Sequence, residues 1–317
     1  MAASIPRVRR GAPSYYTRNL QTIKSIYGFT IYPNQLPIIA QAGHPSIPEI
    51  DPFFSPTVSG RIQDIGNFTN FRTSIEYFFG LAPQPRTPTY GAISAIDITQ
   101  FSSDCPSIAA STVVFTISVA DPSRPDYGKF ITYLKQSGFW HFDNQGRVDY
   151  YDLNIPALQD FTNVLVGGNW DDKTIQLIAT KQICDGAQQV CTGANTQYKP
   201  NIGVNLATVI ASLGLNPILD ATMLSQLNLG SLNAGGLSCF AQLTKKPFGT
   251  FNKLWADNVA CRIVHLMLAA VDPDEHCMHV GPTGGGKCVD WAYENRLFAD
   301  APLFGDKYRF ICPADEL

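Results

Sequence analysis

The chain has 317 residues, of which 45% are apolar and 15% are charged, and its net charge is −3. This length is enough for two domains, and this composition is that of a globular protein rather than of a disordered one. The charge gives no basic surface for a nucleic acid. Because no run of about twenty apolar residues occurs, we expect no membrane span.

The first half of the chain predicts an α+β fold after a flexible arm at residues 1–14. Apolar residues recur with helical spacing at 70–80, and they alternate with polar residues at 111–120. In chain order, we expect a helix at 19–32, a strand at 58–62, a helix at 70–80, and strands at 90–99, 111–120, 129–142 and 147–153. The turn at 143–146 joins the last two strands as a hairpin.

The end of this half, SGFWHFDNQGRVDYYDLNIPAL, resembles the closing hairpin of the SnoaL-like/NTF2-like superfamily. FFSPTVSGRI and NFTNFRTSIEYFF are similar to the first strand and following helix of that family. The resemblance covers residues 15–165, and it implies a cone in which a curved antiparallel sheet and helices enclose a cavity for a small hydrophobic molecule. It also leaves open a homodimer through the sheet.

Enzymes of that superfamily carry a histidine or an aspartate in the cavity as general acid or base. The matching candidates are Asp97, His141 and Asp152, all on expected strands. If His141 and Asp97 point inward, they form a proton-transfer pair that Asp152 orients, and no cofactor is needed. The alternative is that Trp140 and Phe142 face the cavity, so that His141 faces solvent, and that Asp97 is exposed.

Residues 166–317 read as a cysteine-rich helical domain, with helices expected at 174–190, 204–213, 219–227 and 253–270. It resembles uncharacterised secreted fungal proteins. Seven of the eight cysteines lie after residue 180, and no C-x-x-C motif occurs. We expect three or four disulfides among Cys105, Cys184, Cys191, Cys239, Cys261, Cys277, Cys288 and Cys312.

Cys184 and Cys191 lie about 10 Å apart along a helix, so each must bond a different neighbour. Disulfides indicate an oxidising compartment, and the sequon at Asn67 agrees with secretion and glycosylation. No signal peptide is visible at residues 1–30, so we expect a mature secreted form. The alternative is a cytosolic protein with eight free thiols.

His265, His276 and His279 are candidate ligands for zinc or copper, because imidazole nitrogens suit both ions and three-residue spacing places two of them on one side of a turn. Alternatively, His265 is a buried core histidine and the others are loop residues. Nearby, the segment 281–288 resembles a phosphate-binding loop, but Cys288 stands where a magnesium-binding hydroxyl is required. We therefore expect a glycine-rich loop between disulfide cysteines.

These observations leave three functions open. The first is a cofactor-independent isomerase, cyclase or dehydratase, which would be a lyase or an isomerase. The second is a non-enzymatic module for ligand binding or oligomerisation. The third is a metal-binding protein that uses the three C-terminal histidines.

Overall fold

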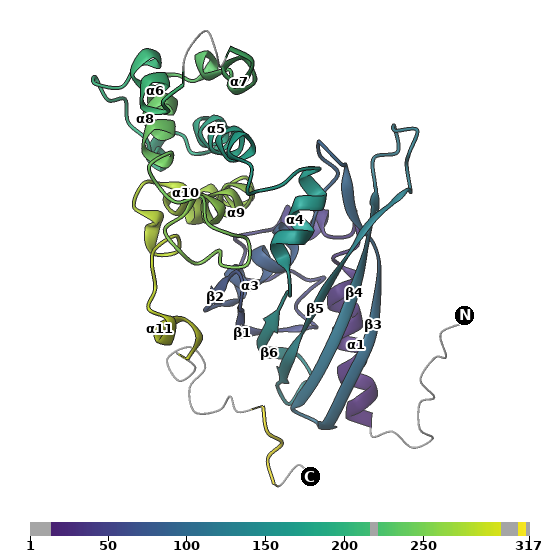
Figure 1. The fold of residues 1–317 in the computed structure, drawn as a ribbon. Helices are drawn as coiled ribbons and strands as arrows, with labels where there is room; N and C mark the ends of the chain where they lie inside the picture. The colour runs from purple at the N-terminus through teal and green to yellow at the C-terminus, as the bar shows by residue number, and fades with distance from the viewer. Residues whose placement is uncertain (1–13, 216–220, 299–309, 315–317) are drawn as a thin grey trace.

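A curved six-stranded sheet forms the centre of the first half of the chain (Figure 1). The computed structural model describes residues 14–215, 221–298 and 310–314. The strands are β1 (Phe54–Ile62), β2 (Gly66–Phe68), β3 (Gly91–Cys105), β4 (Ile108–Val119), β5 (Phe130–Phe142) and β6 (Val148–Asn154). Their order across the sheet is β2-β1-β6-β5-β4-β3. Only the β1–β6 pair among these strands is parallel.

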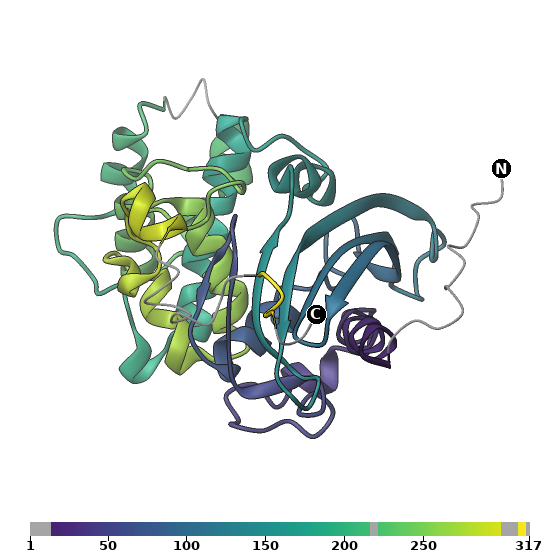
Figure 2. The same cartoon turned by 90° about the horizontal axis from the view of Figure 1, so that it is seen from below.

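The sheet separates an inner, buried face from an outer face. On β4, the alternating residues Val113, Phe115 and Ile117 are buried, as their spacing predicts. Three register irregularities interrupt the pairing of β3 with β4. Irregularities of this kind bend a sheet and increase its twist, and Figure 2 shows the strands curling around the space beside α1 (Ser14–Gly28).

Helices cover the inner face of the sheet and form most of the second half. Those of the first half are α1, α2 (Leu36–Ile39), α3 (Phe71–Ile75) and the single π-helical turn η1 (Glu76–Gly80). Those that follow the sheet are α4 (Leu158–Val166), α5 (Lys173–Val190), η2 (Gly193–Asn195), α6 (Leu206–Ser212), α7 (Ala221–Leu227), η3 (Leu229–Ser231), α8 (Ala234–Leu243), α9 (Val259–Ala269), α10 (Pro273–Val280), η4 (Gly284–Gly286) and α11 (Tyr293–Leu297).

Four disulfides link the helices and the chain end, as the cysteine count predicts. Cys184 bonds Cys239 and Cys191 bonds Cys277, so α5 is joined to α8 and to α10. Cys184 of α5 and Cys191 at its C-terminal cap therefore do have different partners. Cys261 of α9 bonds Cys288, and Cys105 at the end of β3 bonds Cys312. Together with the curved sheet, these bonds confirm the predicted α+β class with a crosslinked helical second half.

Some expected helices differ in their bounds. The helix expected at 19–32 is α1, Ser14–Gly28. The helix expected at 253–270 begins only at Val259, because the Asn258 side chain accepts a hydrogen bond from the backbone of Cys261 and fixes the first turn there. The helix expected at 219–227 is observed as α7, and residues 219–220 lie outside the described part. The arm expected at 1–14 also lies outside it, apart from Ser14.

Candidate functional site

The main candidate binding site is a cavity of about 560 Å³ between the inner face of the sheet and the helices. Side chains from both halves of the chain line it. Phe115 and Leu134 come from β4 and β5, Phe161 from α4, and Val264 and Met267 from α9. A space of this size with apolar walls fits a small apolar ligand.

A buried polar pair interrupts the apolar wall. The hydroxyl of Tyr27, on α1, donates to Oε1 of Gln136, on β5, at 2.8 Å. Burial raises the pKa of Tyr27 far above its usual value, so the hydroxyl stays protonated and remains a donor. Since Oε1 is already engaged, the amide nitrogen of Gln136 is the group that can donate to a ligand.

The solvent-exposed lining residues mark the mouth of the cavity. Leu36 of α2 and Met267 of α9 are 38% and 36% exposed, and Arg86 lies exposed on the loop before β3. Among the described lining residues, the side chains that can gain or lose a proton are Tyr27, Tyr77 and Arg86. The walls therefore offer neutral hydrogen-bond donors and one peripheral cation, rather than a carboxylate and histidine pair.

The three residues predicted to be catalytic lie on the outer face of the sheet. Trp140 and Phe142 are buried on the inner side, whereas His141 is only partly buried and its Nδ1 lies 2.6 Å from Asp149. Asp97 is exposed between the inward-facing Ile96 and Ile98. The alternative orientation considered for His141 is thus the observed one.

The structure does not bring Asp97 and His141 together. Asp97 pairs with Val114, and Val114 pairs with Lys135, which precedes His141 by six positions on β5. The two side chains are therefore about 20 Å apart along the strand direction. The proton-transfer pair expected from the sequence has no support in this geometry.

Asp152 forms an ion pair with Arg61 on the neighbouring strand β1. It also accepts from the amide of Gln63, at 3.3 Å, on the outer side of the sheet. Phe310 covers this region and stacks on Tyr150, with ring centroids 5.1 Å apart. Asp152 therefore holds strands together in the described structure.

The three histidines predicted as metal ligands do come together. His265 lies on α9, and His276 and His279 lie on α10; all three are buried. The Nδ1 atoms of His265 and His279 each lie 3.4 Å from Nδ1 of His276. One nitrogen from each of the three rings falls within 4.8 Å of the others, which is close enough for one ion.

Residues of the sheet half complete the surroundings of these histidines. Nε2 of His276 lies 2.9 Å from a carboxylate oxygen of Glu76, and both side chains are about 1% exposed. Tyr77 places its hydroxyl 3.1 Å from Nε2 of His265 and its ring on the cavity wall. Glu76 is further paired with Arg72, on the preceding turn.

Two of these histidines, His265 and His279, are neutral near physiological pH. Burial, with smaller contributions from neighbouring histidines, lowers the pKa of His265 well below its usual value. Burial likewise lowers the pKa of His279, to about 3. Neutral imidazoles with free lone pairs are the form that binds a metal ion.

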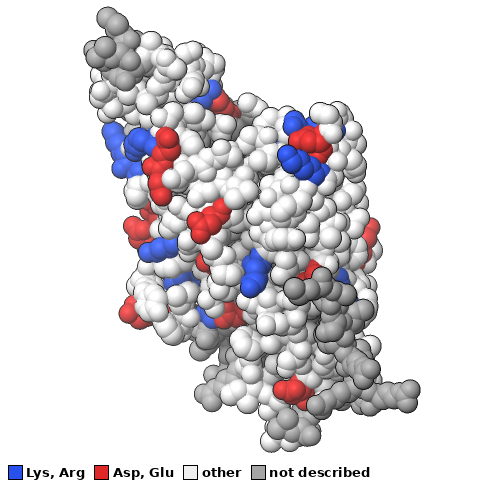
Figure 3. Space-filling view, turned by 45° about the vertical axis from the view of Figure 1, so that its right-hand side comes forward, with Lys and Arg blue, Asp and Glu red and all other residues white. Residues whose placement is uncertain are grey.

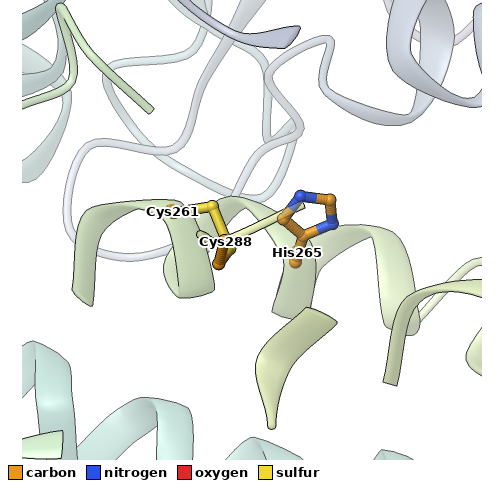
Figure 4. Close-up of side chains that lie close together, drawn as sticks. All are labelled: Cys261, His265 and Cys288. Carbon is orange, nitrogen blue, oxygen red and sulfur yellow. A yellow bond between two sulfur atoms is a disulfide. The ribbon is translucent and has the colours of Figure 1, made fainter. Parts of the chain in front are cut away.

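A disulfide lies directly beside the cluster. Figure 4 shows the bond between Cys261 and Cys288 next to the ring of His265. Because both sulfur atoms are bonded to each other, they are not available as ligands, and the three histidines are the donor set. Cys277, between two of the histidines, is tied to Cys191 in the same way.

The loop that resembles a phosphate-binding motif closes over the histidines. Gly284, Gly285 and Gly286 all have positive φ angles, which favours glycine at each position. A Cβ atom at Gly285 would lie 2.8 Å from Cδ2 of His279. Lys287 donates to the carbonyl oxygen of Asn67 at 3.0 Å. As expected, the segment is a glycine-rich loop between the disulfide-bonded Cys277 and Cys288.

Four residues of these sites were not predicted from the sequence: Tyr27, Gln136, Glu76 and Tyr77. The sequence did contain a signal for Gln136, since it is a polar residue on the same face of β5 as the inward-facing Leu134 and Trp140. Glu76 and Tyr77 offered none, because their partners lie almost 200 positions later in the chain.

Charged side chains are sparse on the outside of the molecule. On the face shown in Figure 3, acidic and basic residues are interspersed. None of the described helices has the length and apolar character needed to cross a bilayer.

Known proteins are similar to this chain in both halves. A protein from Aspergillus brasiliensis named bifonsecin B biosynthesis cluster protein A is 27% identical over 249 residues, which cover 75% of this chain and 70% of that protein. A protein from Aspergillus niger named aurasperone B biosynthesis cluster protein A is also 27% identical, covering 75% and 68%.

A solved structure is similar over the first half. It is a protein from Jannaschia sp. CCS1 named as a SnoaL-like polyketide cyclase, with a TM-score of 0.34, 11% identity, and coverage of 49% of this chain and 96% of that chain.

Family models match more of the length. The BfoA N-terminal domain matches residues 31–153, and the BfoA family C-terminal domain matches residues 236–291. In sequence order, the chain thus matches both domains of the BfoA family.

Proposed function

We propose that this protein binds an apolar small molecule in the cavity between the sheet and α9, as part of a biosynthetic route. The observation that carries the proposal is the 560 Å³ space with mostly apolar walls and a buried polar pair. Ligand pockets of this kind combine mostly apolar contacts with a few placed polar groups. The relatives named for biosynthesis clusters support a role of the same sort.

The polar pair suggests which ligand and which reaction fit. The amide nitrogen of Gln136 can donate to a carbonyl or hydroxyl oxygen of a ligand held against Phe115 and Leu134. Tyr27 is a positioning residue, because its hydroxyl engages Oε1 and leaves the amide nitrogen to donate to a ligand. A donor fixed in an apolar site polarises a carbonyl, so ring closure or isomerisation of a bound ketone is the fitting reaction class.

A binding-only role is the second candidate, because no described lining residue is a carboxylate or a histidine. The ketone 2-tetralone distinguishes the two roles, since it combines an aromatic body with one carbonyl. An enzyme of this class polarises the carbonyl through the Gln136 amide, while solvent takes the α-proton and returns a deuteron. It therefore accelerates the exchange of the α-hydrogens for deuterium in D₂O, and Gln136→Leu removes the acceleration. A binding protein holds 2-tetralone and leaves the exchange at the rate in buffer.

Asp97, His141 and Asp152 have no part in this proposal, because they lie on the face of the sheet away from the cavity.

We extend the proposal to the compartment. Four disulfides favour secretion. A glycan on Asn67, which is partly buried, and a homodimer through the sheet both remain predictions. Mass spectrometry of secreted, non-reduced protein tests secretion and the glycan on Asn67, and sedimentation tests the homodimer.

A pair of matched substitutions tests the location of the ligand. Leu134 lines the cavity, whereas its neighbour Tyr133 points outward and is 61% exposed. We expect Leu134→Trp to weaken the binding of the fluorescent probe anilinonaphthalene sulfonate at least about tenfold, or by about 1.4 kcal/mol. Tyr133→Trp should leave binding unchanged. Equal effects of the two substitutions would contradict the proposal.

A further inference from the structure

The histidine cluster behind the cavity wall has the arrangement of a metal centre. Nitrogens bound to a tetrahedral zinc ion at 2.0–2.1 Å lie about 3.3–3.4 Å from each other. The Nδ1 atoms of His265 and His279 both lie 3.4 Å from that of His276. Two separations in the structure thus agree with the spacing that one ion would impose.

Hydrogen bonding without an ion explains this arrangement poorly. Nε2 of His276 faces the Glu76 carboxylate, so it carries the proton, and Nδ1 keeps the single lone pair. Two other Nδ1 atoms approach that one lone pair at 3.4 Å, where hydrogen bonds are weak. One lone pair cannot satisfy two donors well, whereas three lone pairs converging on a cation are all satisfied.

The surroundings of the cluster match those of metal-binding histidines. Ligating histidines usually donate their second nitrogen to a carboxylate, and His276 donates to Glu76. His265 can donate its Nε2 hydrogen to the hydroxyl of Tyr77, 3.1 Å away. The disulfides at Cys261 and Cys277 fix α9 and α10, so the rings are held in place before an ion arrives.

We propose that Nδ1 of His265, His276 and His279 hold one zinc ion, that Glu76 orients His276, and that Tyr77 separates the ion from the cavity. The described residues supply three ligands, and sites with three protein ligands keep a fourth position for water or substrate. The inference goes beyond ligand binding in the cavity, and the two can fail separately.

The test measures zinc on the full, disulfide-bonded chain. After chelation and dialysis, the wild-type protein should bind about one zinc ion per chain, and cobalt(II) should give the intense visible absorption of a four-coordinate site. His279→Gln should abolish stoichiometric binding. His141→Gln is the matched control, since His141 lies on the outer face of the sheet with Asp149 as its partner, and it should retain one ion.

The Glu76→Gln variant distinguishes a role of Glu76 in orienting the metal ligand His276 from a general effect on folding. We expect it to weaken zinc affinity about 10–100-fold in competition with a chromogenic chelator, while excess zinc still restores one ion per chain. Intact disulfides and near-ultraviolet circular dichroism show that each variant is folded. Less than stoichiometric zinc on the folded wild-type protein, or unchanged affinity in folded Glu76→Gln and His279→Gln, would overturn the proposal.

Discussion

Replacement of Cys261 and Cys288 by alanine tests how the helical half is stabilised. The bond closes a loop of 27 residues, and the chain-entropy relation gives a contribution of about 3.5 kcal/mol for a loop of this length. The same relation gives about 4.2 kcal/mol for Cys184–Cys239, across 55 residues, and about 4.6 kcal/mol for Cys191–Cys277, across 86. Each double alanine variant should lose stability, with the smallest loss for Cys261–Cys288 and the largest for Cys191–Cys277.

The assay is guanidinium unfolding followed by circular dichroism, with the free energy of unfolding extrapolated to water. The slope of that free energy with denaturant should rise, because the unfolded chain is less compact without the crosslink and exposes more surface. A loss below about 1 kcal/mol for all three pairs would refute the reasoning, since α5, α8, α9 and α10 would then hold together without crosslinks.

Two further substitutions probe the surroundings of the histidines. Gly285→Ala should lower the free energy of unfolding, measured by thermal unfolding, by about 2 kcal/mol, because the positive φ of this residue and its contact with His279 both oppose a Cβ atom. Gly286→Ala should cost only about half as much, because the new Cβ atom would meet no neighbour. Burial raises the pKa of Asp257, but hydrogen bonds from Lys246 and from the buried Arg262 outweigh it, and the pKa is lowered overall. The stabilisation that ionised Asp257 gives to the folded state is therefore present above pH 4, and it is lost as the pH falls through the lowered pKa. Asp257→Asn should therefore cost about 1 kcal/mol at pH 7 and progressively less as the pH falls below 4, and an equal cost at pH 7 and at low pH would contradict the ion pair.

The sequence predicted the sheet well, because alternation on β4 and β5 is a local signal. It did not decide which face of β5 is inside, since Phe139 and Trp140 are both large and aromatic. Trp140 packs inward, while Phe139 meets Phe310, which is 171 positions away, with centroids 5.2 Å apart. No local pattern contains that contact, so the orientation of His141 stayed open.

Helix α10 was not among the expected helices, and its sequence, PDEHCMHV, is polar. The capping signals were nevertheless present. Asp272 accepts from the backbone of Glu275, and Pro273 occupies the first turn. These two residues fix the start of the helix, and the three-residue spacing then places His276 and His279 on one side. The histidine cluster was thus predictable, whereas the contact with Glu76 was not, because it joins the two halves of the chain.

The cavity was expected within residues 15–165, but α9 contributes part of its wall. Val264 and Met267 belong to a helix whose apolar face reads as ordinary core in the sequence. Only the packing of the halves against each other reveals that this face is shared between the core and a binding space.

A crystal structure of the protein with 2-tetralone tests the central claim most directly. We predict electron density for the ketone between β5 and α4, with its oxygen within about 2.7–3.2 Å of the amide nitrogen of Gln136. Density only on the outer face of the sheet, near Phe310, or a cavity closed by movement of α9 would contradict the account.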